Sequence, residues 1–179
     1  DGDGQVSWAA GGRVSFQRPD HSWESMIRRI GVISDTHGLL RPEALRALAG
    51  SDLILHAGDV GGDGILEELE AVAPVVGVRG NVDHGPWAMD LPATQVVEVE
   101  DALIYLLHDV SGMDLNPEAA GFSAVVFGHS HQPEIRNTRG VEYFNPGSAG
   151  PRRFANPVTV GFLDVTRAGL VPRVVHLKV

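Results

Sequence analysis

The first half of the chain alternates short apolar runs with amphipathic segments. Residues 30–34, 52–56 and 74–78 each centre on an apolar run with the length of a buried strand. Two segments between these runs, residues 42–49 and 63–72, carry apolar residues at helical spacing along one side. Such alternation favours parallel strands joined by helical crossovers. We therefore predict three neighbouring parallel strands with two helices between them.

Short strand-like runs dominate the second half of the chain. They occur at residues 95–99, 102–107, 124–127, 141–144, 158–164 and 173–179. A helix is expected there only at residues 116–121. Many short strands separated by turns favour a second sheet that packs on the first. The predicted fold class is therefore α/β, a layered α/β/β/α sandwich of two mixed sheets flanked by helices.

The N-terminal residues differ in character from the rest of the chain. Residues 5–8 and 13–16 alternate weakly between polar and apolar positions on either side of a Gly-Gly pair, which predicts a small hairpin. Met26 lies just before the first strong strand pattern. We interpret residues 1–25 as an N-terminal extension or a non-native leader, and residues 26–179 as a single domain.

Charge and composition narrow the classes of function. The 179 residues carry a formal net charge of −9, which argues against broad electrostatic binding to nucleic acid or to an anionic membrane. The chain has no cysteine, so disulfides and thiolate-bound metals are excluded. No apolar run approaches the roughly 20 residues needed to span a bilayer, and no signal peptide is recognisable. We therefore expect a cytoplasmic protein. A homo-oligomer is a further possibility that the sequence leaves open.

Polar side chains suited to metal binding follow five of the predicted strands. They are Asp35, His37, Asp59, Asn81, His108, His129 and His131. The carboxyl ends of parallel strands are where open α/β sheets place ligands, so we expect these side chains to converge. Carboxylate and amide oxygens together with imidazoles suit a pair of divalent cations that holds water and a phosphate.

Each of these residues has a simpler interpretation when taken alone. Asp35 could cap a following helix, Asp59 could be a turn carboxylate, and Asn81 could occupy a β-turn. His56 lies inside a predicted strand, and we interpret it as a core histidine rather than a ligand. The joint occurrence of the seven donors, each in the same strand-end context, favours the metal site over a series of separate turns.

At these motifs the chain resembles the calcineurin-like metallophosphoesterase superfamily. More narrowly, it is similar to the YfcE/MJ0936 group of small phosphodiesterases, which also contains the Vps29-like proteins. The resemblance extends from residue 30 to about residue 178, and the segment Asn145-Pro146-Gly147-Ser148, followed by Pro151-Arg152, is typical of the small group. It implies a metallo-dependent phosphatase-like sandwich.

The resemblance also implies a division of the seven donors between two metal ions. Asp35, His37 and His131 would hold the first ion, Asp59 would bridge, and the second ion would take Asn81, His108 and His129. Manganese is the favoured cofactor, and Ni²⁺, Zn²⁺, Co²⁺ or Fe would also suit nitrogen and oxygen ligands.

The implied reaction is hydrolysis of a small phosphodiester by in-line attack of a metal-bridging hydroxide. Asp59, Asn81 and His108 are implied to act in catalysis. A scaffold role like that of Vps29, or a phosphomonoesterase on the same centre, remains as an alternative.

Two positions depart from the family pattern. Val82 stands where many superfamily members carry a histidine that could act as general acid, so the source of the leaving group's proton is open, with His84 as one candidate. Asp109 and Val110 stand where the small group often has glycine and then histidine. Contacts to the substrate at that position are therefore expected to differ in this chain.

Overall fold

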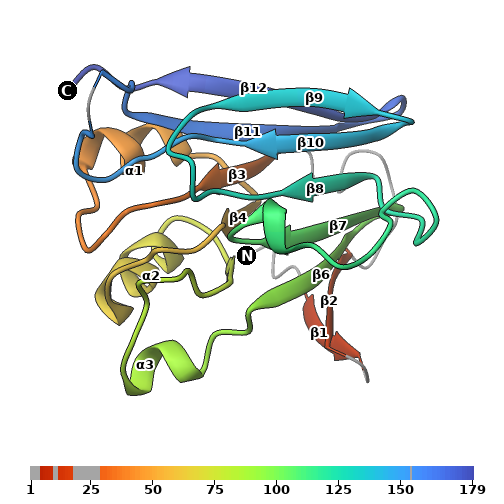
Figure 1. Ribbon diagram of the computed structural model, residues 1–179, viewed down its shortest axis with the longest axis horizontal. Helices are drawn as coiled ribbons and strands as arrows, with labels where there is room; N and C mark the ends of the chain where they lie inside the picture. Colours follow the sequence, from red (N-terminus) through yellow and green to blue (C-terminus); the bar gives the residue numbers. More distant parts are fainter. Residues whose placement is uncertain (1–4, 10–11, 18–28, 154) are drawn as a thin grey trace.

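Two mixed β-sheets face each other in the computed structural model, which describes residues 5–9, 12–17, 29–153 and 155–179 (Figure 1). The five-stranded sheet has the order β12 (Gly169–His176), β11 (Thr159–Thr166), β3 (Arg29–Ile33), β4 (Leu53–His56) and β5 (Val75–Gly77). The seven-stranded sheet has the order β1 (Gln5–Ala9), β2 (Arg13–Gln17), β6 (Thr94–Val99), β7 (Ala102–Leu107), β8 (Ala124–Val126), β10 (Val141–Asn145) and β9 (Glu134–Thr138). The predicted sandwich of two mixed sheets is confirmed.

The predicted parallel core of the five-stranded sheet is also confirmed. Strands β3, β4 and β5 pair in parallel, and helices α1 (Pro42–Leu48) and α2 (Asp63–Glu70) make the crossovers between them. Both helices bury apolar side chains, including Leu48 and Leu69, together with Ile33 and Ile54 from the strands. A short third helix, α3 (Pro86–Met89), lies between β5 and β6 and was not predicted.

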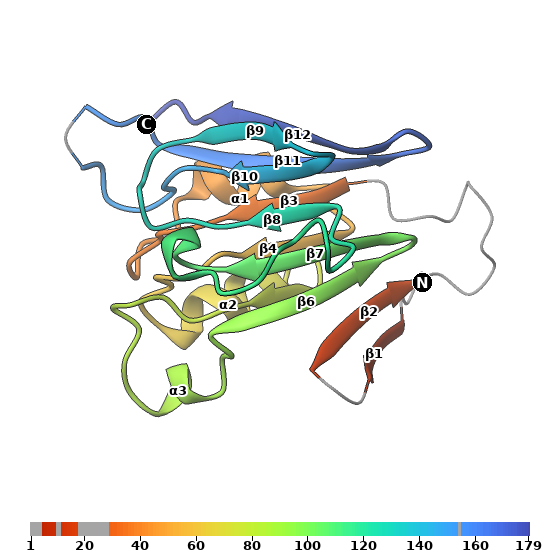
Figure 2. The ribbon, with the colours of Figure 1, turned by 45° about the vertical axis from the view of Figure 1, so that its right-hand side comes forward.

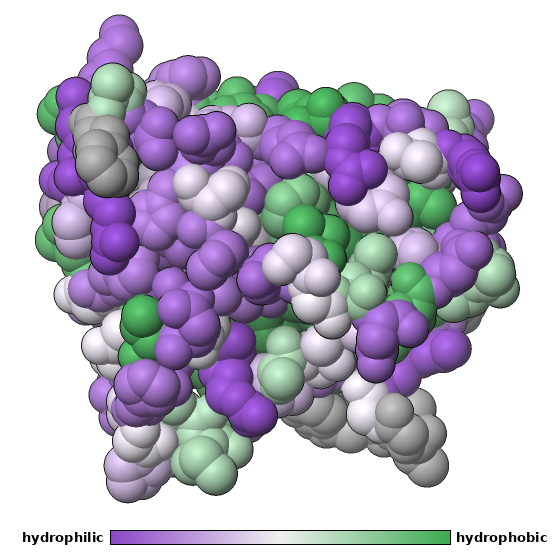
Figure 3. Space-filling view, viewed as in Figure 1, coloured by the Kyte–Doolittle hydropathy of each residue, from purple (hydrophilic) through white to green (hydrophobic). Residues whose placement is uncertain are grey.

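The outer face of the seven-stranded sheet has a thinner cover. Tyr105, Leu107, Val125 and Phe127 form a cluster there, and the segment that follows β7 packs on it through partly buried apolar side chains. In the described part of this segment, regular helix is limited to the single 3₁₀ turn η1 (Val110–Gly112). Polar residues cover most of the molecular face in Figure 3, with a small hydrophobic group near its centre, over β7 and β8.

Three local predictions need correction. The helix expected at residues 116–121 is absent, and residues 117–121 form consecutive turns, because Pro117 and Gly121 leave too few residues between them to propagate a helix. Strand β9 was missed because all five of its residues are exposed, so it has no apolar alternation. Strand β12 begins at Gly169, earlier than expected, since Pro172 is tolerated at the edge of a sheet.

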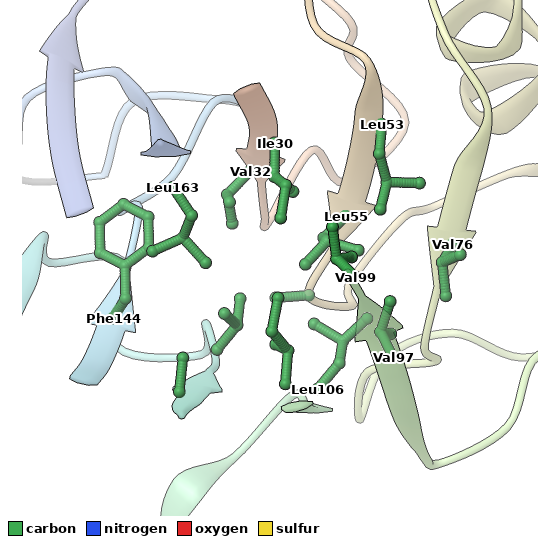
Figure 4. Packing of buried hydrophobic residues seen from close by; sticks show 14 of the residues in the cluster. Ile30, Val32, Leu53, Leu55, Val76, Val97, Val99, Leu106, Phe144 and Leu163 are labelled. Atoms are coloured by element: carbon green, nitrogen blue, oxygen red, sulfur yellow. The ribbon is translucent and has the colours of Figure 1, made fainter. Parts of the chain in front are cut away.

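The main hydrophobic core lies between the two sheets (Figure 4). Ile30, Val32 and Leu55 point into it from the five-stranded sheet, and Leu106 and Phe144 point into it from the opposite sheet. Each of these five side chains is fully buried. Burial of a side chain of this size contributes about 1.5–3 kcal/mol, so this core holds the two sheets, and with them the loops at the strand ends, in one arrangement.

The predicted N-terminal hairpin is confirmed and extends the seven-stranded sheet (Figure 2). Strand β2 pairs in parallel with β6, and Val14 and Phe16 are 0% and 3% exposed within the core between the sheets. The side-chain amide of Gln95 on β6 donates a hydrogen bond to the carbonyl of Gly12 in the hairpin turn. Strand β2 therefore contributes to the core of the domain. Whether residues 1–25 are native stays a prediction.

We predict that Phe16→Ala lowers the free energy of unfolding by about 3–5 kcal/mol, because it leaves a cavity between the sheets. Chemical denaturation followed by circular dichroism measures this loss. The matched control is Arg13→Ala, which removes an exposed side chain of the same strand and its ion pair with Glu98, and should cost less than about 1 kcal/mol. An unfolding midpoint of Phe16→Ala equal to that of the wild type would mean that the hairpin is a dispensable extension.

Candidate metal centre

All seven predicted donors lie on loops that follow strands, and the structure brings their donor atoms together. Asp35 and His37 follow β3, Asp59 follows β4 and Asn81 follows β5. The remaining three come from the opposite sheet, where His108 follows β7 and both His129 and His131 follow β8. The site is therefore built by both sheets, at one end of the sandwich.

The first group of donor atoms contains Asp35, His37 and His131. The Nε2 atom of His131 lies 3.2 Å from Oδ1 of Asp35 and 3.2 Å from Nε2 of His37. The Nε2 atom of His37 lies 3.9 Å from Oδ1 of Asp35 and 3.8 Å from Oδ2 of Asp59. Two imidazoles and a carboxylate thus surround one small volume, and Asp59 borders it.

The second group contains Asn81, His108 and His129. The side-chain oxygen of Asn81 lies 3.0 Å from Nε2 of His108 and 3.0 Å from Nδ1 of His129. The Nε2 atom of His108 also lies 3.2 Å from Oδ2 of Asp59. The same oxygen of Asp59 therefore faces an imidazole of each group.

The donor set and its spacing fit divalent cations. Nitrogen and oxygen ligands bind such ions at about 2.0–2.2 Å, which places neighbouring donor atoms roughly 3–3.5 Å apart around one ion. The closest contacts within the two groups fall in this range. In addition, Oδ1 of Asp35 is a buried carboxylate oxygen without a hydrogen-bond partner among the described residues. An unpaired buried acceptor is costly, and a cation would satisfy it.

The protonation states favoured at His37 and Asp59 suit metal binding. Burial lowers the pKa of His37, and the nearby charges of Asp59 and Asp35 offset this only in part. Burial would raise the pKa of Asp59, but hydrogen bonds from His108 and from the N–H of Val82 lower it overall. A neutral imidazole and an ionised carboxylate are the forms that bind metals.

His108 is held by its other ring nitrogen. Its Nδ1 lies 2.7 Å from the carbonyl oxygen of Ala57, and a carbonyl can only accept, so Nδ1 carries the hydrogen. Burial lowers the pKa of His108, but the contacts with the Asp59 carboxylate and the Ala57 carbonyl raise it overall. A metal ion at Nε2 would therefore have to displace a proton that the ion-free site favours. This arrangement turns Nε2 toward Asp59 and Asn81, and a backbone partner of this kind fixes the tautomer of a metal-binding histidine.

The backbone of the site is strained. Five of the seven donor residues have left-handed φ angles, which are 55° for Asp35, 47° for His37, 53° for Asp59, 69° for His129 and 58° for His131. Each such residue costs roughly 1–2 kcal/mol relative to the right-handed conformation. Strain of this kind persists only where the surroundings enforce it, and it concentrates at functional sites.

Asp83 is one of the residues that enforce this geometry, and the sequence did not reveal its role. Its side chain is buried and accepts hydrogen bonds from the N–H groups of Val60 at 3.0 Å, Gly61 at 2.9 Å and Gly80 at 2.8 Å. It therefore joins the loop that carries Asp59 to the loop that carries Asn81. The only signal was an acidic residue two positions after Asn81, which by itself is also typical of a turn.

The Asn145–Ser148 segment performs a similar task on the opposite sheet. The buried amide of Asn145 donates hydrogen bonds to the carbonyl of Gly128 at 2.8 Å and to the hydroxyl of Ser130 at 3.1 Å. The hydroxyl of Ser148 donates to the carbonyl of Asp35 at 3.1 Å. This segment thus ties the loop that bears His129 and His131 to the loop that bears Asp35 and His37.

At two positions near the donors the backbone packs so closely against a neighbouring side chain that only glycine fits. A Cβ atom on Gly80 would overlap the carboxylate of Asp59, and a Cβ on Gly128 would overlap Ser34 and approach Oδ2 of Asp35 to 2.8 Å. Both loops therefore depend on the absence of a side chain to bring the donors together.

His56 is a core histidine, as expected. Its Nδ1 accepts a hydrogen bond from the N–H of Gly58 at 3.2 Å, so Nε2 carries the hydrogen and donates to the hydroxyl of Thr36 at 2.9 Å. Burial lowers the pKa of His56 to about 4, so it is neutral at physiological pH. His84, the candidate acid, is exposed, and Val82 is 46% exposed beside Asn81.

We predict that Asp83→Ala lowers the free energy of unfolding by about 3 kcal/mol, because three backbone N–H groups, of which that of Val60 is buried, lose a charged acceptor. Asp83→Asn keeps one acceptor oxygen and should lose less. Guanidinium denaturation of the metal-free protein measures both changes. Unfolding midpoints that match the wild type in both variants would show that Asp83 does not hold the loops.

Comparison with known proteins places this geometry in a family. The calcineurin-like phosphoesterase superfamily domain matches residues 29–168. A probable metallophosphoesterase of Methanothermobacter thermautotrophicus is 37% identical over 72% of this chain and 81% of its own length. The phosphodiesterase YfcE of Escherichia coli K12 is 30% identical over 77% of this chain and 88% of its own length.

Solved structures agree with this placement. The structure of YfcE, described as a phosphoesterase from E. coli, covers 84% of this chain and 100% of its own, with a TM-score of 0.62 and 26% identity. Vps29 from Entamoeba histolytica, solved in complex with zinc, covers 84% of this chain and 99% of its own, with a TM-score of 0.62 and 20% identity, so it shows the shared fold. The chain therefore belongs to the calcineurin-like phosphoesterase superfamily and is a phosphoesterase.

Proposed function

We propose that this chain is a dinuclear metal-dependent phosphodiesterase. The observation that carries the proposal is the position of Asp59. Its Oδ2 atom lies 3.2 Å from Nε2 of His108 and 3.8 Å from Nε2 of His37, so one carboxylate borders both groups of donors. A shared carboxylate is the feature that distinguishes a pair of neighbouring ions from a single one.

The seven donors divide between the two ions as the family resemblance implied. Asp35, His37 and His131 would hold one ion, and Asn81, His108 and His129 would hold the other, with Asp59 shared between them. Manganese is the favoured metal, and Ni²⁺, Zn²⁺, Co²⁺ or Fe would suit the same nitrogen and oxygen ligands. When bound, the ions supply a hydroxide at neutral pH for in-line attack on phosphorus.

The residues of the chain contribute position and charge to this reaction. Asp59 is 3% exposed and accepts a hydrogen bond from the backbone N–H of Val82. Asn81 adds a neutral oxygen, which limits the negative charge that an approaching phosphate must overcome. Together with His108, these side chains are the catalytic residues of the proposal, because they border the place where the phosphate would react.

The substrate we propose is a small phosphate ester. Asn81 and His129 are exposed, so the second donor group is open to a ligand. The net charge of −9 disfavours a long polyanion such as a nucleic acid, whereas a single phosphate needs attraction only at the centre itself. None of the helices in the described part of the chain has the length and apolar character to cross a membrane. A cytoplasmic location and a homo-oligomeric state stay predictions.

A scaffold role like that of Vps29 is the competing interpretation. A scaffold has no need for metal donors, so it could lose some of them. This chain keeps all seven, and Asp83, Asn145 and Ser148 hold the loops that carry them. These features favour an enzyme.

We predict that Asp59→Asn reduces hydrolysis of bis(p-nitrophenyl) phosphate by at least about 100-fold, since a lost metal ligand should cost more than a lost partner of a ligand. The amide keeps the size of the side chain and an acceptor for the N–H of Val82, so the fold should survive. The assay uses metal-stripped protein with Mn²⁺ restored, and a p-nitrophenyl monoester in parallel tests the monoesterase alternative.

Asp90→Asn, which changes an exposed acid outside the centre, is the control and should keep wild-type turnover. Turnover retained by Asp59→Asn would contradict the mechanism. A wild-type protein that takes up no Mn²⁺ and hydrolyses neither ester would favour the scaffold.

A further inference from the structure

Asp109 stands at a position where the chain departs from its family, and its two oxygens have different surroundings. It directly follows His108 and lies at the N-terminus of the 3₁₀ turn η1, where Oδ1 accepts a hydrogen bond from the N–H of Ser111 at 2.9 Å. The other oxygen, Oδ2, lies 3.8 Å from Nε2 of His129. Asp109 therefore binds the turn with one oxygen and faces a metal-centre histidine with the other.

The two ring nitrogens of His129 also face different partners. Nδ1 lies 3.0 Å from the side-chain oxygen of Asn81, within the second donor group, whereas Nε2 is the nitrogen that faces Asp109. A neutral imidazole carries one hydrogen and one lone pair, and which nitrogen binds a metal is decided by the partner of the other. The environment of Nε2 therefore decides whether Nδ1 can act as a ligand.

Within the described part of the chain, Asp109 is the only carboxylate outside the donor set that lies within 4.0 Å of one of the site histidines. His108 has the carbonyl of Ala57 as its second partner and is only 5% exposed. The side chain of His129, by contrast, is 47% exposed. Burial does not fix this ring, so it depends on a partner.

We propose that Asp109 is a positioning residue for His129. Its carboxylate attracts the Nε2–H group and so keeps the lone pair of Nδ1 directed toward Asn81 and His108. At 3.8 Å the contact is longer than a direct hydrogen bond, and the attraction between the carboxylate charge and the N–H dipole carries the preference. The inference rests on the proposed metal centre, because it concerns the tautomer in which His129 can bind an ion.

With an ion bound at Nδ1, the arrangement would be a carboxylate–histidine–metal triad, in which the outer carboxylate raises the basicity of the ring and fixes its orientation. Removal of such a partner typically costs about 10- to 100-fold in metal affinity. The loss should affect one of the two ions, since His129 belongs to the second donor group only. The contacts of Asp35, His37 and His131 do not involve Asp109.

Two substitutions separate this role from the simpler role of Asp109 as a cap of η1. Asp109→Asn keeps a capping oxygen for Ser111, and its NH₂ group then faces Nε2 of His129. The NH₂ group can donate only to a nitrogen without a hydrogen, so it favours the tautomer in which Nε2 is the acceptor and Nδ1 carries the hydrogen. In that tautomer Nδ1 has no lone pair to offer a metal ion. Asp109→Ala removes both contacts and leaves Nε2 to water.

The experiment is a calorimetric titration of metal-stripped protein with Mn²⁺. The expected result is that one of two binding events weakens by about 10- to 100-fold in Asp109→Asn and by a smaller factor in Asp109→Ala, while the other is unchanged. Asp114→Asn, an exposed acid in the same segment, is the control for loss of charge and should bind as the wild type does.

The order of the variants decides between the interpretations. A cap alone predicts that Asp109→Ala is weaker and Asp109→Asn is like the wild type, and loss of charge alone predicts equal weakening. Either result overturns the proposal. Nitrogen NMR of the zinc-loaded wild type gives a second readout, in which Nε2 of His129 should carry the hydrogen, and a hydrogen on Nδ1 would overturn it.

The wild-type titration keeps this inference distinct from the proposed function. Two Mn²⁺ ions bound by an active wild type, with variants that fall in another order, would reject the role of Asp109 alone. A wild type that binds no metal would reject both.

Discussion

The rest of the structure depends on one electrostatic constraint, which is that two buried carboxylates lie among four imidazoles at one end of the sandwich. Asp35 and Asp59 are 0% and 3% exposed, and neither faces a lysine or arginine in its described contacts. Buried charge is costly unless it is paired. Divalent cations would provide that pairing, and because Asp59 borders both donor groups it couples the two positions. The proposed two-metal chemistry depends on this one shared carboxylate.

The fold places the carboxylates and imidazoles together because loops from both sheets meet at one end of the sandwich. The core between the sheets fixes where the strands end, but it does not by itself direct the side chains. Asp83 and Asn145 do so, through hydrogen bonds to the backbone of loops distant in sequence. These bonds support the loops of three left-handed donor residues, Asp59, His129 and His131, and the hydroxyl of Ser148 binds the carbonyl of a fourth, Asp35. The hydrogen bonds of Asp83 and Asn145 thus offset part of the backbone strain at the donor residues.

How far the sequence predicts this molecule depends on how local each signal is. The three parallel strands and the convergence of the seven candidate donors are predictable because apolar runs and strand-end residues are local patterns. Strand β9 is not, since its residues are all exposed and an edge strand needs no alternation. The roles of Asp83 and Asn145 are not predictable either, because their partners lie on other loops and the backbone groups they bind leave no mark in the sequence. The pairing of Asp109 with His129 likewise becomes visible only when η1 and the loop after β8 are seen together.

The most direct test of the central claim is a crystal structure of the Mn²⁺-loaded protein with anomalous scattering recorded at the manganese edge. We expect two anomalous peaks about 3.5–4 Å apart, both in contact with the carboxylate of Asp59. A single peak, or two peaks of which only one contacts Asp59, would contradict it.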